Sequence, residues 1–323
     1  MDMAWALSRK DGVMPVFDSV LDVIGHTPVV RLRRVVPPDS ATVLVKLEYM
    51  NPTGSYKDRM ARAIIEGAER RGDLRPGMTV VECTGGSTGS SLAFVCSCKG
   101  YPLRIVTSDA FAPEKLRTIA AFGGELIIKP SVGGQITPDL IPRMMERAKG
   151  IAEEDDVYPT DQFHNEDALV GYRNIVTELT EQVDGSIDAF CGGVGTGGMI
   201  VGISRGFREL ASHPEIVGLE PASAPLLSEG RTGSHQIEGV GVGFVPPLLR
   251  DGDLDRTLAI PEEEAREMAR RLAREEGVFA GTSSGMNVAG AIRLARELGP
   301  GKTVVTVAVD FGLKYLAGDL YSG

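Results

Sequence analysis

The sequence predicts an α/β protein of two domains, in which mainly parallel, twisted sheets are flanked by helices. Short apolar runs alternate with longer stretches whose apolar residues recur at helical spacing, and this alternation is typical of β-α units built around a parallel sheet. Glycine accounts for 40 of the 323 residues and is frequent at the predicted strand–helix junctions, where tight turns need it. The length suits one large or two modest domains.

The individual elements follow from local periodicity. Short apolar runs predict strands at Thr42–Leu47, Thr79–Glu82, Leu103–Thr107, Glu125–Ile128, Ala189–Gly192, Ile216–Glu220 and Thr303–Val309. Apolar residues spaced three or four apart, with charged residues between them, predict helices at Asp58–Arg71, Ser87–Lys99, Pro113–Phe122, Arg143–Glu153, Met199–Leu210, Pro261–Glu276 and Met286–Glu297. The acidic, proline-containing stretch Glu153–Pro159 predicts a domain boundary.

Charge and cysteine content narrow the functional classes. The net charge of −10 argues against nucleic acid or an anionic membrane as a general partner. No apolar run is long enough to span a membrane, and the first twelve residues lack the apolar region of a signal peptide. The four cysteines form no CxxC pair and no cluster with histidine, which predicts buried free thiols rather than a metal site or disulfides. We therefore expect a cytoplasmic protein without a metal ion.

The first of three glycine motifs is Gly193–Gly198, which reads GVGTGG between a predicted strand and a predicted helix. Backbone N–H groups at a helix N-terminus attract anions, so the motif indicates a phosphate site. The pattern also fits the GxGxxG fingerprint of dinucleotide-binding proteins, with Glu220 about 20 residues further on as the ribose ligand. The motif alone leaves open a dinucleotide, a single phosphate group and a glycine-rich packing turn.

The other two glycine motifs are Gly281–Gly285, which reads GTSSG, and Thr84–Gly89, which reads TGGSTG. The first matches the GxSxG nucleophile elbow of hydrolases, but that fold needs a histidine after the serine, and no histidine follows Ser283. It is better interpreted as a serine-rich turn at a helix start. The second places small residues and hydroxyl groups at a helix N-terminus, which suits a carboxylate or phosphate, or simply a capped turn.

Lys57 lies where the predicted helix Asp58–Arg71 begins, after a glycine-containing turn. Most lysines are solvated surface residues. At a helix N-terminus, however, the positive end of the helix dipole disfavours the ammonium form. A lowered pKa would favour a nucleophilic amine.

Several segments, in one order along the chain, resemble the fold-type II pyridoxal-phosphate (PLP) enzymes. Within these enzymes the resemblance is to the cysteine synthase and cystathionine β-synthase family (O-acetylserine sulfhydrylase-like, with a tryptophan synthase β-like fold). The segments are Ile24–Leu32 (similar to IGNTPLVRL), Asn51–Arg59 (NPxGSxKDR), Gly195–Gly198 (GTGGT), Gln236–Phe244 (KIQGIGAGF), Gly281–Gly285 (GISSG) and Asp310–Leu316 (DSGERYL).

The resemblance implies PLP in a cleft between two domains. The smaller, substrate-side domain spans residues 46–156, and the larger, phosphate-binding domain combines 1–45 with 157–323. Lys57 is then the catalytic residue, which holds the cofactor as a Schiff base and takes the substrate α-proton. The implied cofactor-binding residues are Lys57, Ser87, Gly195, Thr196, Gly197, Gly198, Gly239 and Ser283. The implied substrate-carboxylate residues are Thr84, Gly85, Gly86, Thr88 and Gln162.

The resemblance also implies the reaction. A neutral Ser283 beside the pyridine nitrogen makes the ring a weaker electron sink than an aspartate would, which favours loss of a β-substituent. We therefore expect β-replacement on O-acetylserine or O-phosphoserine, through an aminoacrylate, by a homodimeric enzyme acting on small molecules. The alternatives are a β-eliminating lyase or deaminase of the same fold, an NAD-binding dehydrogenase and a non-catalytic homologue.

The chain departs from the family pattern at four places. Gly85 replaces a serine and so removes a hydroxyl from the carboxylate site, and Ser87 replaces an asparagine that in the family bonds the cofactor's 3′-oxygen. Met199 replaces a phosphate-binding threonine. Phe311 and Leu313 make the C-terminal motif apolar. These changes predict a specialised enzyme whose nucleophile differs from sulfide.

Overall fold

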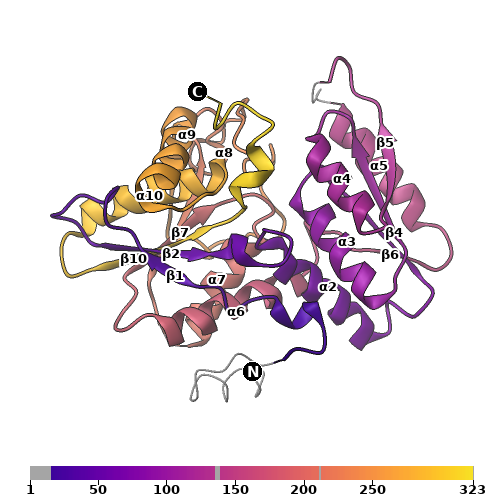
Figure 1. The fold of residues 1–323 in the computed structure, drawn as a ribbon, viewed down its shortest axis with the longest axis horizontal. Coiled ribbons are helices and arrows are strands. Elements are labelled where there is room, and N and C mark those ends of the chain that lie inside the picture. Colours follow the sequence, from indigo (N-terminus) through magenta and orange to yellow (C-terminus); the bar gives the residue numbers. More distant parts are fainter. Residues whose placement is uncertain (1–15, 135–138, 211, 323) are drawn as a thin grey trace.

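The computed structural model describes residues 16–134, 139–210 and 212–322. The N-terminal residues from which no signal peptide is predicted lie outside these ranges. Figure 1 shows two sheets, each flanked by helices, side by side. We call the four-stranded sheet with α3, α4 and α5 (residues 79–159) the four-strand lobe. The six-stranded sheet with α6, α7, α9 and α10 is the six-strand lobe.

The six-stranded sheet contains one antiparallel pair, β1 with β2, and is otherwise parallel. Its strands lie in the order β1 (Val29–Arg31), β2 (Thr42–Leu47), β10 (Thr303–Ala308), β7 (Ala189–Gly193), β8 (Glu215–Pro221) and β9 (Arg256–Ile260). Its helices are α6 (Asp167–Gln182), α7 (Gly198–Glu209), α9 (Glu262–Arg271) and α10 (Thr282–Leu298), with a short α8 (Leu226–Glu229).

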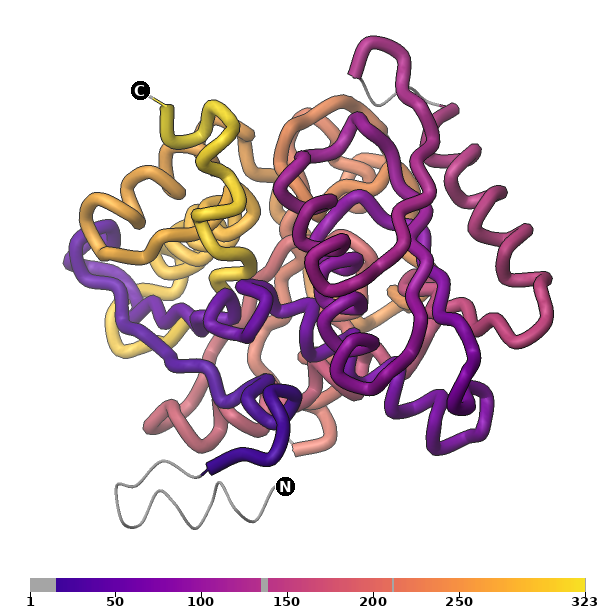
Figure 2. The backbone as a smooth tube through the Cα atoms, turned by 45° about the vertical axis from the view of Figure 1, so that its right-hand side comes forward, coloured from indigo at the N-terminus to yellow at the C-terminus, as the bar shows by residue number. Residues whose placement is uncertain are grey.

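Alternating side chains send the two faces of this sheet into different cores. Val43 and Val304 belong to the core that also contains residues of α9 and α10. Leu44, Phe190 and Val305 face the core formed with α6 and α7. The sheet is thus buried on both faces, as the almost continuous apolar runs of its central strands require. Figure 2 shows the N-terminal segment beside the C-terminal one, because β2 pairs with β10.

The four-strand lobe is wholly parallel, with strands in the order β5 (Glu125–Lys129), β4 (Leu103–Ser108), β3 (Thr79–Cys83) and β6 (Val157–Pro159). Residues of α3 (Ser87–Lys99) fill the core on one face, and residues of α5 (Leu140–Ala152) fill the core on the other. The remaining helix is α4 (Pro113–Ala121).

Helix α2 (Lys57–Arg71) contacts helices of both lobes, α6 and α3. It ends at Gly72, whose left-handed conformation (φ 79°) lets its N–H bond the carbonyls of Ala68 and Glu69. Asp58 in its first turn accepts from the N–H and hydroxyl of Thr53, at 2.8 and 2.6 Å. The helix begins at Lys57 itself, one residue earlier than predicted.

The structure adds elements that the sequence analysis did not predict: α6, α8 and the strands β1, β6 and β9. The predicted helix Pro261–Glu276 instead ends at Arg271 and continues as a π-helical turn, Leu272–Glu276. The predicted domain boundaries at 46 and 156 stay predictions. By sheet membership the chain leaves the six-stranded sheet after β2 and leaves the four-stranded sheet after β6.

Two further findings concern features predicted from composition. None of the helices in the described ranges combines the length and apolar character that crossing a bilayer demands. The four thiols are free, but Cys98 is exposed and Cys83 only half-buried. The prediction that all four are buried is therefore wrong for Cys98, which lies in the last turn of α3.

Candidate active site

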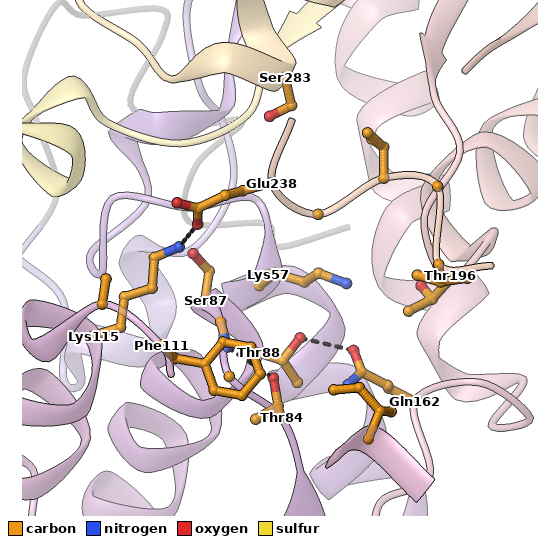
Figure 3. A pocket seen from close by; sticks show the side chains of 18 of the residues that line it. Lys57, Thr84, Ser87, Thr88, Phe111, Lys115, Gln162, Thr196, Glu238 and Ser283 are labelled. Atoms are coloured by element: carbon orange, nitrogen blue, oxygen red, sulfur yellow. Dashed lines mark hydrogen bonds and ion pairs between the residues drawn. The ribbon is translucent and has the colours of Figure 1, made fainter. Parts of the chain in front are cut away.

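A cavity of about 1890 Å³ is lined by residues of both lobes (Figure 3). Most of the predicted site residues line it: Lys57, Thr84, Gly85, Gly86, Ser87, Thr88, Gln162, Thr196, Gly239 and Ser283. Gly195 instead borders a much smaller neighbouring cavity, and Gly197 and Gly198 continue the turn from Thr196 into α7. The structure thus brings these residues around one space, and their individual roles stay proposals.

Lys57 presents a buried amine to this cavity from the first turn of α2. Among the described residues, the hydrogen-bonding atom within reach of Nζ is the thioether sulfur of Met60, at 3.8 Å. Burial lowers the pKa of the ammonium from 10.5 to about 8, and the negative charges of Asp310 and Glu82 offset part of that shift. A substantial neutral fraction near pH 8 is what an amine needs in order to attack a carbonyl.

The turn between β7 and α7 offers free backbone N–H groups. The first bond of α7 runs from Val201 N to Gly197 O, so the preceding amides of the first turn have no partner within the helix. Gly197 has a φ of 83°, and a β-carbon on Gly195 would overlap the carbonyl oxygen of Gly239. Only glycine allows this close approach of the two loops, which leaves a concave group of amides suited to a phosphate.

Glu220, the acid that the dinucleotide interpretation needs as a ribose ligand, is engaged elsewhere. Its carboxylate accepts hydrogen bonds from the N–H groups of Leu227 and Ser228, at 2.7 and 2.9 Å, and from the Ser228 hydroxyl at 2.5 Å. It is buried, and it binds the backbone N–H groups in the first turn of the short helix α8. This occupied carboxylate weighs against a dinucleotide and favours a single phosphate at the turn.

The Thr84–Gly89 loop and Gln162 face each other across the cavity. The Thr88 hydroxyl donates to the side-chain oxygen of Gln162 at 2.8 Å, which leaves the amide nitrogen of Gln162 as the group able to donate into the cavity. The Gln162 backbone N–H is anchored on the buried Glu82, at 3.2 Å, and Glu82 also accepts from Thr160 at 2.6 Å. These fixed donors suit a small carboxylate.

Ser87 is tied to the C-terminal motif. Its hydroxyl donates to Asp310 Oδ2 at 2.9 Å, and Lys314 Nζ donates to the Ser87 oxygen at 3.3 Å. Burial acts to raise the pKa of Asp310, but the charges of Lys314 and Lys115, with hydrogen bonds from Ser55 and Ser87, outweigh it and hold the pKa below its usual value. Asp310 is therefore an anion beside the cavity, and it orients the Ser87 hydroxyl.

Thr282 and Ser283, at the start of α10, also line the cavity. Gly281 caps the helix and packs so tightly on the Tyr315 ring that a β-carbon there would overlap it. Ser283 lines the cavity, whereas the Ser284 hydroxyl accepts from Val309 N at 2.8 Å. The Thr282 hydroxyl is buried and has no partner among the described residues.

Residues without a role predicted from the sequence also line the cavity, among them Phe111, Lys115, Glu238 and Asp310. Lys115, on α4, forms an ion pair with Glu238, which precedes Gly239 in the six-strand lobe, so the pair bridges the cleft (Figure 3). The signal for Asp310 was its place at the head of the C-terminal motif. Phe111 and Lys115 carried no local signal, because Phe111 is placed by packing on β3, β4 and α5 within its lobe and Lys115 by its partner in the other lobe.

The donor set fits a phosphorylated aldehyde such as pyridoxal phosphate. The buried Lys57 amine, whose lowered pKa of about 8 makes the neutral form accessible, suits the aldehyde, and the free amides at the start of α7 suit the phosphate. The orphaned Thr282 hydroxyl and the cavity-lining Ser283 provide neutral groups for a heteroaromatic ring. No cluster of three or more potential metal ligands occurs in the ranges that the structure describes.

The comparisons with known proteins agree with this fit. A curated cysteine synthase from Staphylococcus aureus is 42% identical over 308 residues, which cover 94% of this chain and 97% of that protein. The crystal structure of an O-ureido-L-serine synthase matches with a TM-score of 0.87 and 36% identity, over 96% of each chain. The cysteine synthase (OASS) of Entamoeba histolytica matches with a TM-score of 0.89 and 29% identity, over 96% of this chain and 92% of that one.

The family model described as "Pyridoxal-phosphate dependent enzyme" matches residues 20–310, which include the Lys57 segment, the Gly193–Gly198 turn and the GTSSG turn. Because this match covers most of the chain, the protein belongs to the pyridoxal-phosphate dependent enzyme family.

Proposed function

We propose that this protein is a β-replacement enzyme. It exchanges the β-substituent of a serine-derived amino acid, of the O-acetylserine or O-phosphoserine type, for a small nucleophile. The observation that carries the proposal is the buried Lys57 amine, with a pKa of about 8, whose hydrogen-bond partner among the described residues is a thioether, opposite a turn of free amides. The names of the similar proteins, cysteine synthase and O-ureido-L-serine synthase, denote enzymes that make β-substituted amino acids.

When bound, pyridoxal phosphate supplies an electron sink for the electrons released at the substrate Cα. Lys57 would hold the cofactor through its aldehyde, and the Lys57 Nζ would take the proton from the substrate Cα. The amides of Thr196, Gly197 and Gly198, with the close approach of Gly195 to Gly239, hold the phosphate. Burial of Lys57 helps both tasks, because the neutral amine is the nucleophile and the base.

The substrate carboxylate is held by the Thr84–Gly89 loop. In this assignment the Thr88 hydroxyl orients Gln162, whose amide nitrogen donates to the carboxylate beside the backbone N–H of Gly85. Thr84 stabilises the loop itself, since its hydroxyl accepts from Gly86 N at 3.1 Å.

Two serines from opposite lobes line the cavity and would hold the cofactor ring. Ser283 would be the neutral partner of the ring nitrogen, which would leave the ring a weaker sink and favour departure of the β-substituent. The Ser87 hydroxyl donates to Asp310, so its orientation is fixed before the cofactor binds. The implied homodimer and cytoplasmic location belong to the proposal through the family resemblance alone.

The decisive experiment begins with cofactor uptake. Protein reconstituted with pyridoxal phosphate is expected to absorb near about 410 nm, as a lysine-bound cofactor does. Lys57→Ala should lose this band, and the surface variant Lys302→Ala should keep it. A wild-type protein without the band, or one that instead binds a nicotinamide cofactor, would contradict the proposal.

The second step is a substrate assay with O-acetylserine and O-phosphoserine, each with sulfide and with other small nucleophiles. Formation of the β-substituted amino acid supports β-replacement, and the best nucleophile defines the reaction. Pyruvate released without any added nucleophile would assign the β-eliminating lyase instead. Efficient cysteine formation from sulfide would contradict the prediction that the nucleophile differs from sulfide, but it would still support β-replacement.

A further inference from the structure

The substrate side of the cavity contains an aromatic ring that the sequence analysis did not anticipate. Phe111 lies between β4 and α4 and lines the cavity together with Lys57, Thr88 and Gln162. In Figure 3 its ring lies directly beside the Thr84–Thr88 loop. The ring is therefore close to the place where the loop meets a substrate carboxylate.

Phe111 fills the space that a side chain at position 85 would need. A β-carbon built on Gly85 would overlap three ring carbons of Phe111, including the one attached to its own β-carbon. Because that overlap reaches the base of the ring, the ring would have to leave its rotamer to make room. The neighbouring Gly86 differs, since a β-carbon there meets nothing within 4 Å.

The ring is held by its surroundings. Phe111 packs against the apolar cluster of Val81, Val106, Leu140, Met144 and Ile151, which joins β3 and β4 to α5. Its backbone N–H donates to Ser108 O at 3.3 Å, at the end of β4. The four-strand lobe thus presents the ring as a fixed wall.

We propose that Phe111 is a specificity-determining residue. Its ring occupies the space beside Gly85, where the family pattern has a serine side chain, and closes the amino-acid site with an apolar wall. The glycine and the ring form one unit. Backbone N–H groups of the loop, with Gln162, then hold the carboxylate, and the ring limits the bulk of the amino acid. This inference rests on the proposed function.

The first test reads folding stability, and it uses holoenzyme and apoprotein alike. Gly85→Ala is expected to lower Tm by several degrees, because the new methyl group collides with the ring. The matched control Gly86→Ala should leave Tm within about a degree of wild type. In a protein that already carries Phe111→Ala, adding Gly85→Ala should lower Tm far less than it does in the wild type, because the ring is no longer there to collide with. The proposed pairing of Gly85 with Phe111 would be overturned if Gly85→Ala and Gly86→Ala changed Tm equally. It would also be overturned if the Tm changes of Gly85→Ala and Phe111→Ala simply added in the double variant.

The second test reads substrate choice through the cofactor's absorbance, titrated with L-serine and the bulkier L-methionine. Phe111→Ala, and Phe111→Leu in case the first folds poorly, should improve binding of L-methionine relative to L-serine by about tenfold or more, the order expected when a pocket gains room for a methylene or two. An unchanged ratio in variants that bind the cofactor overturns this inference alone. Failure of the wild type to bind the cofactor overturns the proposed function and this inference with it.

Discussion

The Lys57 amine owes its character to residues that are distant in the sequence. The glycine-containing turn before Lys57 predicted that a helix begins there, and the family motif predicted that this lysine is the catalytic one. Its burial, however, depends on segments that are distant in the sequence and meet around the cavity. The charge that most raises its pKa is on Asp310, over 250 residues further along the chain. Sequence patterns reveal the nucleophile, whereas its electrostatic environment needs the folded chain.

The pH dependence of Lys57 tests this environment. Labelling of the apoprotein with a small amine-reactive reagent, followed by mass spectrometry of the Lys57 peptide, should reach half its maximal rate at about pH 8. Only the neutral amine reacts, so labelling falls as the pH drops below that value. Removing the nearby negative charge with Asp310→Asn should lower the pKa further and move the profile to lower pH. The surface variant Glu297→Gln should not move it, and a shift to higher pH in Asp310→Asn would contradict the assignment.

At the scale of elements, buried ion pairs fix helix α2. The Arg59 guanidinium binds Glu48 at 2.7 Å and Glu178, on α6, at 2.6 Å, and Lys46 lies 2.7 Å from Glu178. All four side chains are almost fully buried. This network joins β2, α2 and α6, and so sets the position of the helix that begins with Lys57.

Arg59→Met should cost about 3–5 kcal/mol in the free energy of unfolding, because it removes the ion-pair partner of the buried Glu48 and leaves the buried Glu178 with Lys46 alone. Arg62→Met, three residues along the same helix, removes two partly exposed ion pairs, with Glu66 and Asp22, and a hydrogen bond to Leu21 O, and should cost about 1 kcal/mol or less. Urea unfolding of both variants gives the comparison. Similar losses in the two would show that the buried network does not anchor α2.

The elements that sequence patterns predicted are those with strong periodicity and clear ends. Ser87–Lys99 and Thr42–Leu47 have the predicted bounds, since a glycine follows the helix and alternating valines mark the strand. The missed helix α6 contains Gly171 and several β-branched residues, which weaken its intrinsic helix propensity, and its stability comes from packing against α7 and α2. Strands β1 and β6 have three residues each, too few for a pattern to appear.

At the scale of the whole molecule, one ion pair crosses the cleft. Lys115 is almost fully buried on α4, and its partner Glu238 belongs to the loop around Gly239 in the six-strand lobe. A buried ammonium without a counter-ion is costly, so the pair favours closely approached lobes.

Glu238→Gln should loosen this contact. Deuterium uptake in the peptide covering residues 232–245 is expected to rise several-fold, because local opening no longer breaks an ion pair. Asp319→Asn is the matched control, since it removes a cavity-lining pair with Arg266 that does not join the two lobes. If both variants exchange like the wild type, the pair does not restrain the cleft.

The pairing of β2 with β10 has a consequence for how the chain is made. Strand β2 (Thr42–Leu47) is synthesised long before its parallel neighbour, Thr303–Ala308. Until then the β1–β2 hairpin has an unpaired edge, while all strands of the four-strand lobe are already available. Such late, long-range closure makes folding slow and exposes an apolar edge during translation. The nascent chain therefore needs β10 to complete the sheet that β1 and β2 begin.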